Sequence, residues 1–99
     1  MENIIMRVIE KKMVEAINSR ENFRLNNTSV HYIKDSNYSE VYLHSHMIAI
    51  KYHDTDTLEV NTKTLFNWPT VTTKSRLRAL GANVTTKKGV TYLDGVELV

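Results

Sequence analysis

The sequence has no cysteine, one proline and only three glycines among its 99 residues. The absence of cysteine excludes disulfides, thiolate metal ligands and a cysteine nucleophile. With 41% hydrophobic and 24% charged residues, the composition is not that of a disordered chain. The apolar run Ile4-Ile5-Met6 is too short for a signal segment or a membrane span. We therefore expect one globular domain over residues 1–99, with no membrane contact and a cytoplasmic location.

Acidic residues are absent from the whole stretch between Val60 and Leu93. Residues 1–59 hold seven Lys or Arg and nine Asp or Glu, whereas residues 60–99 hold six and two. The first part is therefore net negative and the second net positive, although the chain carries only +2 overall. This asymmetry predicts an anionic partner for the second half.

The N-terminal segment shows helical periodicity from residue 2 to about residue 18. Apolar residues recur every four positions, at Ile5, Ile9, Met13 and Ile17. The apolar set is larger than a single packed face requires, so two interpretations remain. The segment is either the core helix of the domain, which we favour, or a helix that also forms a homodimer.

The rest of the chain reads mainly as strands. Alternation and turn residues predict a meander with strands at 28–34, 39–44, 47–52 and 57–61, the last continuing through 62–66. Pro69 interrupts this pattern. Thr72 or Thr73 then caps a short helix at 74–80, and Gly81 is the residue just past its end. Strands at 83–86 and 90–93 form a hairpin, and a further turn leads to 96–99. The expected fold is α+β: an N-terminal helix on an antiparallel sheet of about five to six strands, with a short second helix before a C-terminal hairpin.

One motif resembles a known family. The segment from Trp68 to Leu80 reads Trp-Pro-Thr-Val-Thr-Thr-Lys-Ser-Arg-Leu-Arg-Ala-Leu, and the hairpin from Lys87 to Tyr92 follows it. This arrangement resembles small phage-encoded proteins over residues 47–93, with Asn67 and Arg78 departing from the usual Gly and Asn. The resemblance implies a phage accessory protein in the host-cell cytoplasm, with the N-terminal helix as an addition of this protein.

The main candidate site is a basic cluster with neighbouring threonines and aromatics. It comprises Trp68, Thr72, Thr73, Lys74, Arg76, Arg78, Lys87 and Lys88. Cations suit phosphate contacts, hydroxyls at a helix N-terminus suit an anion, and an aromatic ring stacks on an unpaired base. The plainer interpretation is that the threonines are caps, Trp68 is core, and the lysines form a solvated turn.

Two other constellations are weaker. His44 and His46 have the two-residue spacing of strand metal ligands, but no third ligand is fixed by spacing. His53 with Asp54, Asp56 and Glu59 has acid and base groups, but on a polar turn where such groups are usually solvated. No phosphate-binding loop or nucleophile motif is present. We expect no metal, no cofactor and no enzymatic activity.

The sequence thus predicts a non-catalytic accessory protein that binds a host macromolecule. Nucleic acid, as RNA or single strands, is the first choice, and inhibition of a host defence or toxin protein is the alternative. A protein partner would bind through aromatic hot spots such as Trp68, Tyr38 or Tyr42.

Overall fold

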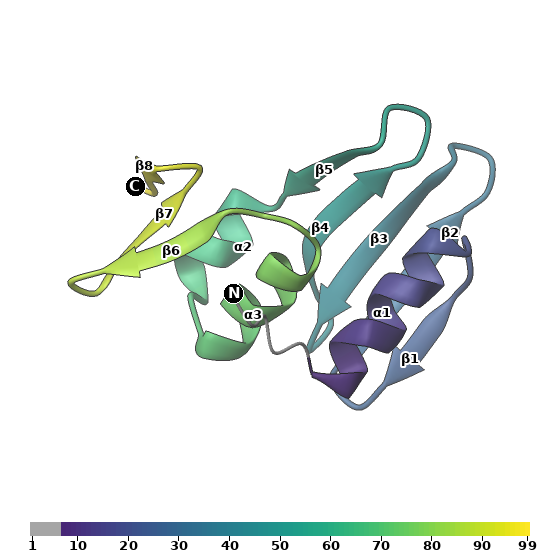
Figure 1. Cartoon of the computed structure of the whole chain (residues 1–99), viewed down its shortest axis with the longest axis horizontal. Coiled ribbons are helices and arrows are strands. Elements are labelled where there is room, and N and C mark those ends of the chain that lie inside the picture. Colours follow the sequence, from purple (N-terminus) through teal and green to yellow (C-terminus); the bar gives the residue numbers. More distant parts are fainter. Residues whose placement is uncertain (1–6) are drawn as a thin grey trace, which may run out of the picture.

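The computed structural model describes residues 7–99, and it confirms the α+β class. Within these residues, three helices and eight strands follow one another, as labelled in Figure 1. The helices are α1 (Val8–Asn18), α2 (Thr62–Asn67) and α3 (Val71–Ala79). The first five strands are β1 (Phe23–Leu25), β2 (Thr28–Ile33), β3 (Tyr38–Leu43), β4 (His46–Tyr52) and β5 (Thr57–Val60). The last three are β6 (Val84–Lys87), β7 (Val90–Leu93) and β8 (Val96–Glu97).

The first five strands form an antiparallel meander in the order β1-β2-β3-β4-β5. Val30 pairs with Val41, which pairs with Ala49, so one row of apolar side chains crosses the central strands on the same face. All three are buried. Strand residues alternate between faces, so the neighbouring residues of each strand point to the other face. This register fixes which residues belong to the core and which belong to the open face.

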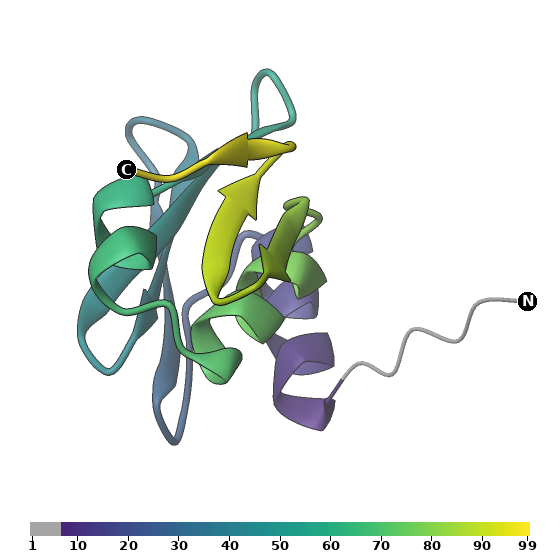
Figure 2. The ribbon, with the colours of Figure 1, turned by 90° about the vertical axis from the view of Figure 1, so that its left-hand side faces the viewer.

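Helices α1 and α3 lie against the same face of this sheet, as the two ribbon views show (Figures 1 and 2). Met13 and Ile17 of α1 and Leu77 of α3 are buried in the core. Within the described residues, the predicted stripe is therefore on the packed side of the helix, with Met13 and Ile17 buried and Ile9 half-buried, as expected for the core helix. Val8 is the one large hydrophobic residue exposed on α1 as described. The predicted helix start and its residues Ile4, Ile5 and Met6 lie outside the described residues.

The predicted antiparallel sheet of about five to six strands is confirmed as the five-stranded sheet, and the last three strands form a separate sheet, β6-β7-β8. The closing hairpin itself is confirmed, with Val84 paired to Leu93 and Lys87 to Val90. Its turn residues Lys88 and Gly89 both have positive φ, as a two-residue hairpin turn requires. The hairpin leans on α3 and extends away from the main sheet (Figure 1).

Three local predictions need correction. Residues 62–66 are helical because the Asn61 side chain accepts a hydrogen bond from the Thr64 backbone N–H and caps α2. Helix α3 begins at Val71, three residues earlier than expected, with Thr70 as its cap. The short strand β1 was not predicted. Gly81 does follow α3 in a left-handed conformation, with φ of 101°, as expected.

Candidate functional site

The eight residues of the predicted basic site fall into two groups. Thr73, Lys74 and Arg76 are buried, and Thr72 is half-buried. Exposed positions are Trp68, Arg78, Lys87 and Lys88. The structure therefore does not bring the eight together on one surface. The buried members have internal partners that account for their position.

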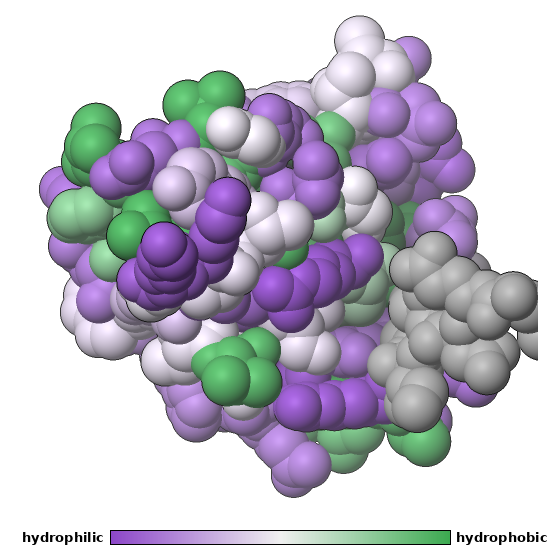
Figure 3. All heavy atoms as spheres, turned by 60° about the vertical axis from the view of Figure 1, so that its left-hand side comes forward, coloured by the Kyte–Doolittle hydropathy of each residue, from purple (hydrophilic) through white to green (hydrophobic). Residues whose placement is uncertain are grey.

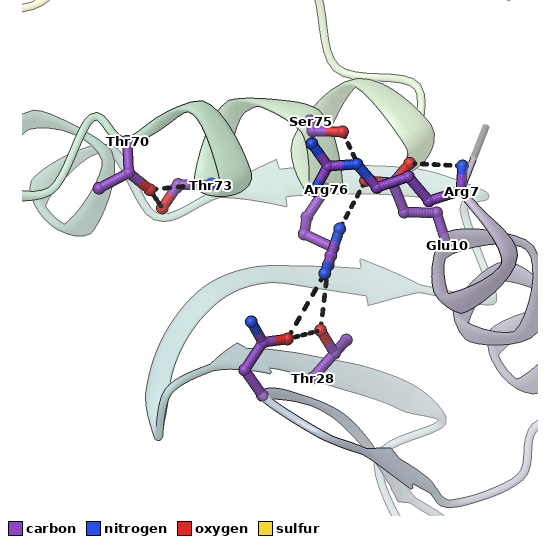
Figure 4. A network of polar contacts seen from close by, with 8 residues as sticks. Arg7, Glu10, Thr28, Thr70, Thr73, Ser75 and Arg76 are labelled. Atoms are coloured by element: carbon purple, nitrogen blue, oxygen red, sulfur yellow. Dashed lines mark hydrogen bonds and ion pairs between the residues drawn. The ribbon is translucent and has the colours of Figure 1, made fainter. Parts of the chain in front are cut away.

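Arg76 is the clearest case, because its guanidinium is held inside the protein (Figure 4). Its Nη1 lies 2.7 Å from Oε2 of Glu10, and the two side chains are only 4% and 2% exposed. Its Nε donates to Oγ1 of Thr28 at 3.0 Å, which links α3 to β2. A guanidinium enclosed in this way has no access to a phosphate, so we do not retain Arg76 as a contact residue.

Glu10 is saturated with donors, and this sets its charge state. The Ser75 hydroxyl donates to Oε2 at 2.6 Å, and the Arg7 backbone N–H donates to Oε1 at 3.1 Å. Burial by itself would raise the pKa of this carboxyl. The hydrogen bonds from Ser75, Arg76 and Arg7 outweigh burial, so the pKa of Glu10 is lowered from its ordinary value. Glu10 is therefore ionised, and it neutralises Arg76 within the core.

The threonines and Lys74 are also engaged locally. Oγ1 of Thr70 accepts from the Thr73 backbone N–H at 3.1 Å, and the two hydroxyls lie 2.8 Å apart. The Nζ of Lys74 donates to the hydroxyl of Thr86 in β6. Thr73 is therefore not the free hydroxyl that the anion-binding interpretation required. Lys74 ties α3 to the hairpin, which is a structural contact.

Trp68 is on the surface, with 49% of its area exposed. Its ring stacks on His46, with centroids 4.5 Å apart and ring planes inclined by 24°. The pair borders a hollow of about 400 Å³ that the ends of β3 and β4 share with α2 and the start of α3. The hollow is lined by Leu43, His44, His46, Ile48, Thr64, Trp68, Thr70, Thr72 and Thr73. No carboxylate is among the lining residues, and the partnership with His46 was not predicted from the sequence.

The exposed cations lie beyond this hollow, on α3 and the hairpin. Arg78 donates from Nε to the Val84 carbonyl at 2.7 Å and stays exposed. Lys87 and Lys88 are exposed at the hairpin turn. Within residues 7–99, none of the three forms an ion pair. Figure 3 shows this side of the molecule, where hydrophilic residues are interspersed with separate hydrophobic ones.

The two histidines of the predicted metal pair both line the hollow, His44 from the β3–β4 turn and His46 from the start of β4, where it stacks on Trp68. In the part of the chain that the structure describes, no group of three His, Asp or Glu residues is placed to hold a metal ion.

The carboxylates of the β4–β5 region each have a separate partner. Asp54 accepts from the Asn37 amide at 2.7 Å, Asp56 pairs with Lys51 at 2.8 Å, and Glu59 accepts from the Tyr52 hydroxyl at 3.0 Å. His53 lies 2.8 Å from the Ser39 hydroxyl. These contacts join neighbouring strands and turns, and they do not converge on a common cleft.

Among residues 7–99, no helix combines the length and hydropathy that crossing a bilayer requires.

Comparison with known proteins identifies a family. No curated protein and no solved structure matches the chain. A family model described as Kyanoviridae Gp96 protein matches residues 6–99. The match includes α1, so the expectation that this helix is an addition of this protein was wrong. The resemblance to phage proteins is confirmed: the chain belongs to the Kyanoviridae Gp96 protein family, a family of phage proteins.

Proposed function

We propose that this phage protein is a non-catalytic binding protein whose partner is a single-stranded nucleic acid, RNA or DNA. The observation that carries the proposal is the exposed Trp68 on a part of the chain that has exposed cations and no acidic residue. A ring that is half exposed offers a stacking surface to an unpaired base. The proposed contact residues are now Trp68, Arg78, Lys87 and Lys88.

The distribution of charge supports an anionic partner. Lys63 on α2 is a further exposed cation of the acid-free stretch. Exposed carboxylates lie at the opposite end of the main sheet, in the β2–β3 and β4–β5 turns, with Asp35, Asp54 and Asp56, and also on the small sheet, with Asp94 and Glu97. The charge that supports the proposal is therefore the local one of the exposed cations on α2, α3 and the hairpin turn, which would attract a polyanion at short range.

The shape of the surface favours single strands over duplex DNA. Helix α3 has nine residues, and its face toward the protein carries Thr73, Lys74, Arg76 and Leu77. Little of so short a helix remains to enter a major groove. Exposed cations spaced along a hairpin and a helix end are suited to following a flexible backbone, with stacking as the second contribution.

The direct test is fluorescence anisotropy with labelled 12-nucleotide RNA, single-stranded DNA and duplex DNA at low salt. We expect saturable binding of the single strands and weaker binding of the duplex. The variant Lys87→Ala/Lys88→Ala should weaken binding about tenfold or more, because two phosphate contacts are lost. The matched control Lys11→Ala/Lys12→Ala removes two exposed lysines from α1 and should change affinity little. Equal loss in both variants, or no binding at all, would refute the proposal.

A protein partner is the second candidate, and a separate surface favours it. The sheet face opposite α1 and α3 carries Tyr38 and Tyr52, packed edge to face with ring centroids 5.8 Å apart, and Ile50 beside them. Tyrosine is common at protein interfaces. If a single host protein copurifies and Tyr38→Ala releases it, while the lysine variants do not, the inhibitor interpretation replaces the nucleic-acid one.

A further inference from the structure

A second hollow, of about 440 Å³, lies beside the β1–β2 and β3–β4 turns. Arg24, Ser29 and Tyr42 form one row across three strands, because Arg24 pairs with Ser29 and Ser29 pairs with Tyr42. This row is on the sheet face opposite Val30 and the core. His31 is two residues farther along β2, on the same face, with its ring centroid 5.2 Å from that of Tyr42.

The two turns that complete the hollow are held together. His44 and Ser45 both have positive φ, of 50° and 68°, which gives a tight hairpin turn. The His44 backbone N–H donates to the Asn27 carbonyl at 2.8 Å and joins this turn to the β1–β2 turn. Oδ1 of Asn27 accepts a hydrogen bond from the hydroxyl of the buried Thr28 at 2.9 Å. This bond fixes the orientation of the Asn27 side chain, which lines the hollow. The hollow is therefore built on fixed backbone.

The chemistry of the lining is that of an anion site. Arg24, His31 and His44 line the hollow together with Ser29 and Ser45, and no carboxylate is among the lining residues. Arg24 is exposed and forms no ion pair within residues 7–99. An unpaired guanidinium beside hydroxyl donors matches the geometry and charge of a phosphate.

One carboxylate is close to the hollow and opposes this role. Glu40 is the cross-strand partner of His31. Its Oε1 accepts from the Tyr42 hydroxyl at 3.1 Å. Burial, followed by the hydrogen bond and the charge of Glu40, raises the pKa of Tyr42, so the Tyr42 hydroxyl remains the donor in this pair. Glu40 is thereby tied to Tyr42 beside the site, where it weakens an anion's binding by charge alone.

We infer that this hollow is a phosphate-binding subsite, in which Arg24 supplies the charge and the Ser29 and Ser45 hydroxyls supply donors. The inference rests on the proposed function and extends it, because His44 lines both this hollow and the one beside Trp68. A strand whose base stacks on Trp68 would reach this hollow by passing the β3–β4 turn at His44, from one face of the sheet to the other. The subsite adds residues of the acidic N-terminal half to an interface that the sequence assigned only to the C-terminal half.

The test is a series of NMR titrations of the intact protein, following backbone amides with inorganic phosphate, uridine monophosphate and uridine. We expect phosphate and the monophosphate to shift the amides of Ser29, His31, His44 and Ser45 saturably, whereas uridine does not. A larger effect of the monophosphate than of inorganic phosphate would identify a nucleotide phosphate as the preferred source. A larger effect of inorganic phosphate would identify free phosphate as the ligand and overturn the assignment to a nucleic-acid strand.

Variants make the test specific. Arg24→Gln should weaken the monophosphate about fivefold or more, whereas Lys34→Gln, at the opposite end of β2, should not. Glu40→Gln should tighten it about twofold, since a nearby negative charge is removed. Unchanged binding in Arg24→Gln, with a dispersed spectrum showing that the variant is folded, overturns the inference. If the 12-nucleotide RNA still binds in a manner that depends on Lys87 and Lys88, the proposed function survives that failure; if neither ligand binds, both fail.

Discussion

Nη1 of Arg76 and Oε2 of Glu10 lie 2.7 Å apart although the residues are 66 positions apart in the chain. The pair joins α3 to α1, and the bond from Arg76 to Thr28 extends the connection to the main sheet. A residue that the sequence presents as a phosphate contact is thus a central structural element. Part of the positive charge of the C-terminal half is therefore buried inside the protein and is not available to a partner.

Replacing Arg76 should destabilise the protein rather than act on binding alone. Arg76→Ala leaves Glu10 buried without its charge partner, and we expect the free energy of unfolding to fall by about 3–5 kcal/mol. The double variant Arg76→Met/Glu10→Leu should recover most of this loss, since no buried charge remains. Urea denaturation followed by Trp68 fluorescence measures both. A loss below about 1 kcal/mol in Arg76→Ala would contradict the placement of the pair.

Stability should also depend on pH through Glu10. The folded-state pKa of Glu10 is lowered from its ordinary value of 4.5. Its contribution to stability is therefore fully present above pH 4.5 and is lost as the pH falls through the lower folded-state value. Glu10→Gln should be less stable at neutral pH and should lose less stability on acidification below pH 4.5. Melting temperatures measured from pH 7 to pH 3 would show this, and parallel curves for the two proteins would contradict it.

We expect the stability of the fold to depend on pH in a second, separate range, through His53. Burial, and after it the positive charges of Arg20 and Lys51, lowers the pKa of His53 from its ordinary value of 6.5. The unfolded chain therefore takes up a proton first, so stability is complete above pH 6.5 and declines as the pH falls from 6.5 toward the folded-state pKa. In His53→Gln, the melting temperature should depend less on pH between pH 6.5 and the folded-state pKa of His53. Its dependence on pH below pH 4.5, which comes from Glu10, should be unchanged. Two-dimensional NMR of the His53 ring gives an independent titration.

Trp68 should separate binding from stability. Because the ring is half exposed and rests on His46, Trp68→Ala should change the free energy of unfolding by no more than about 1 kcal/mol. The same variant should weaken single-strand binding by about 1–3 kcal/mol if one base stacks on the ring. Trp68→Phe should retain part of the affinity. A stable Trp68→Ala protein with unaltered affinity would exclude stacking at this position.

Much of the fold was predictable because it follows from local patterns. The four-residue stripe of α1, the alternation of the meander and the turn residues each depend on neighbouring positions. The burial of Arg76 and Lys74 does not follow from local patterns, because these side chains bond to Glu10 and Thr86, which are distant in sequence. Charge in a sequence predicts exposure by default, and only the tertiary structure identifies the charges that are paired internally.

The sequence does contain a signal for helix α2, which we had predicted to be a strand. Asn61 precedes Thr62, and its side chain caps the Thr64 backbone N–H, which is the pattern of a helix start. The threonines and Phe66 outweighed that signal because β-branched and aromatic residues favour strands. The stacking of Trp68 on His46 follows from this helix, since α2 carries the chain back beside the start of β4. The candidate site was therefore only half predictable.

The most direct test of the central claim is the salt dependence of binding to the 12-nucleotide RNA, measured by anisotropy from 50 to 300 mM salt. Contacts from Arg78, Lys87 and Lys88 to three phosphates should give a slope of log K against log salt of about −2, since each phosphate on a single strand contributes about −0.7, and a fourth phosphate bound at Arg24 should bring it to about −2.8. The Lys87→Ala/Lys88→Ala variant should reduce the magnitude of the slope by about 1.4, because two of these contacts are lost. A slope near zero in the unmodified protein would contradict the account and leave the cations as solvated surface.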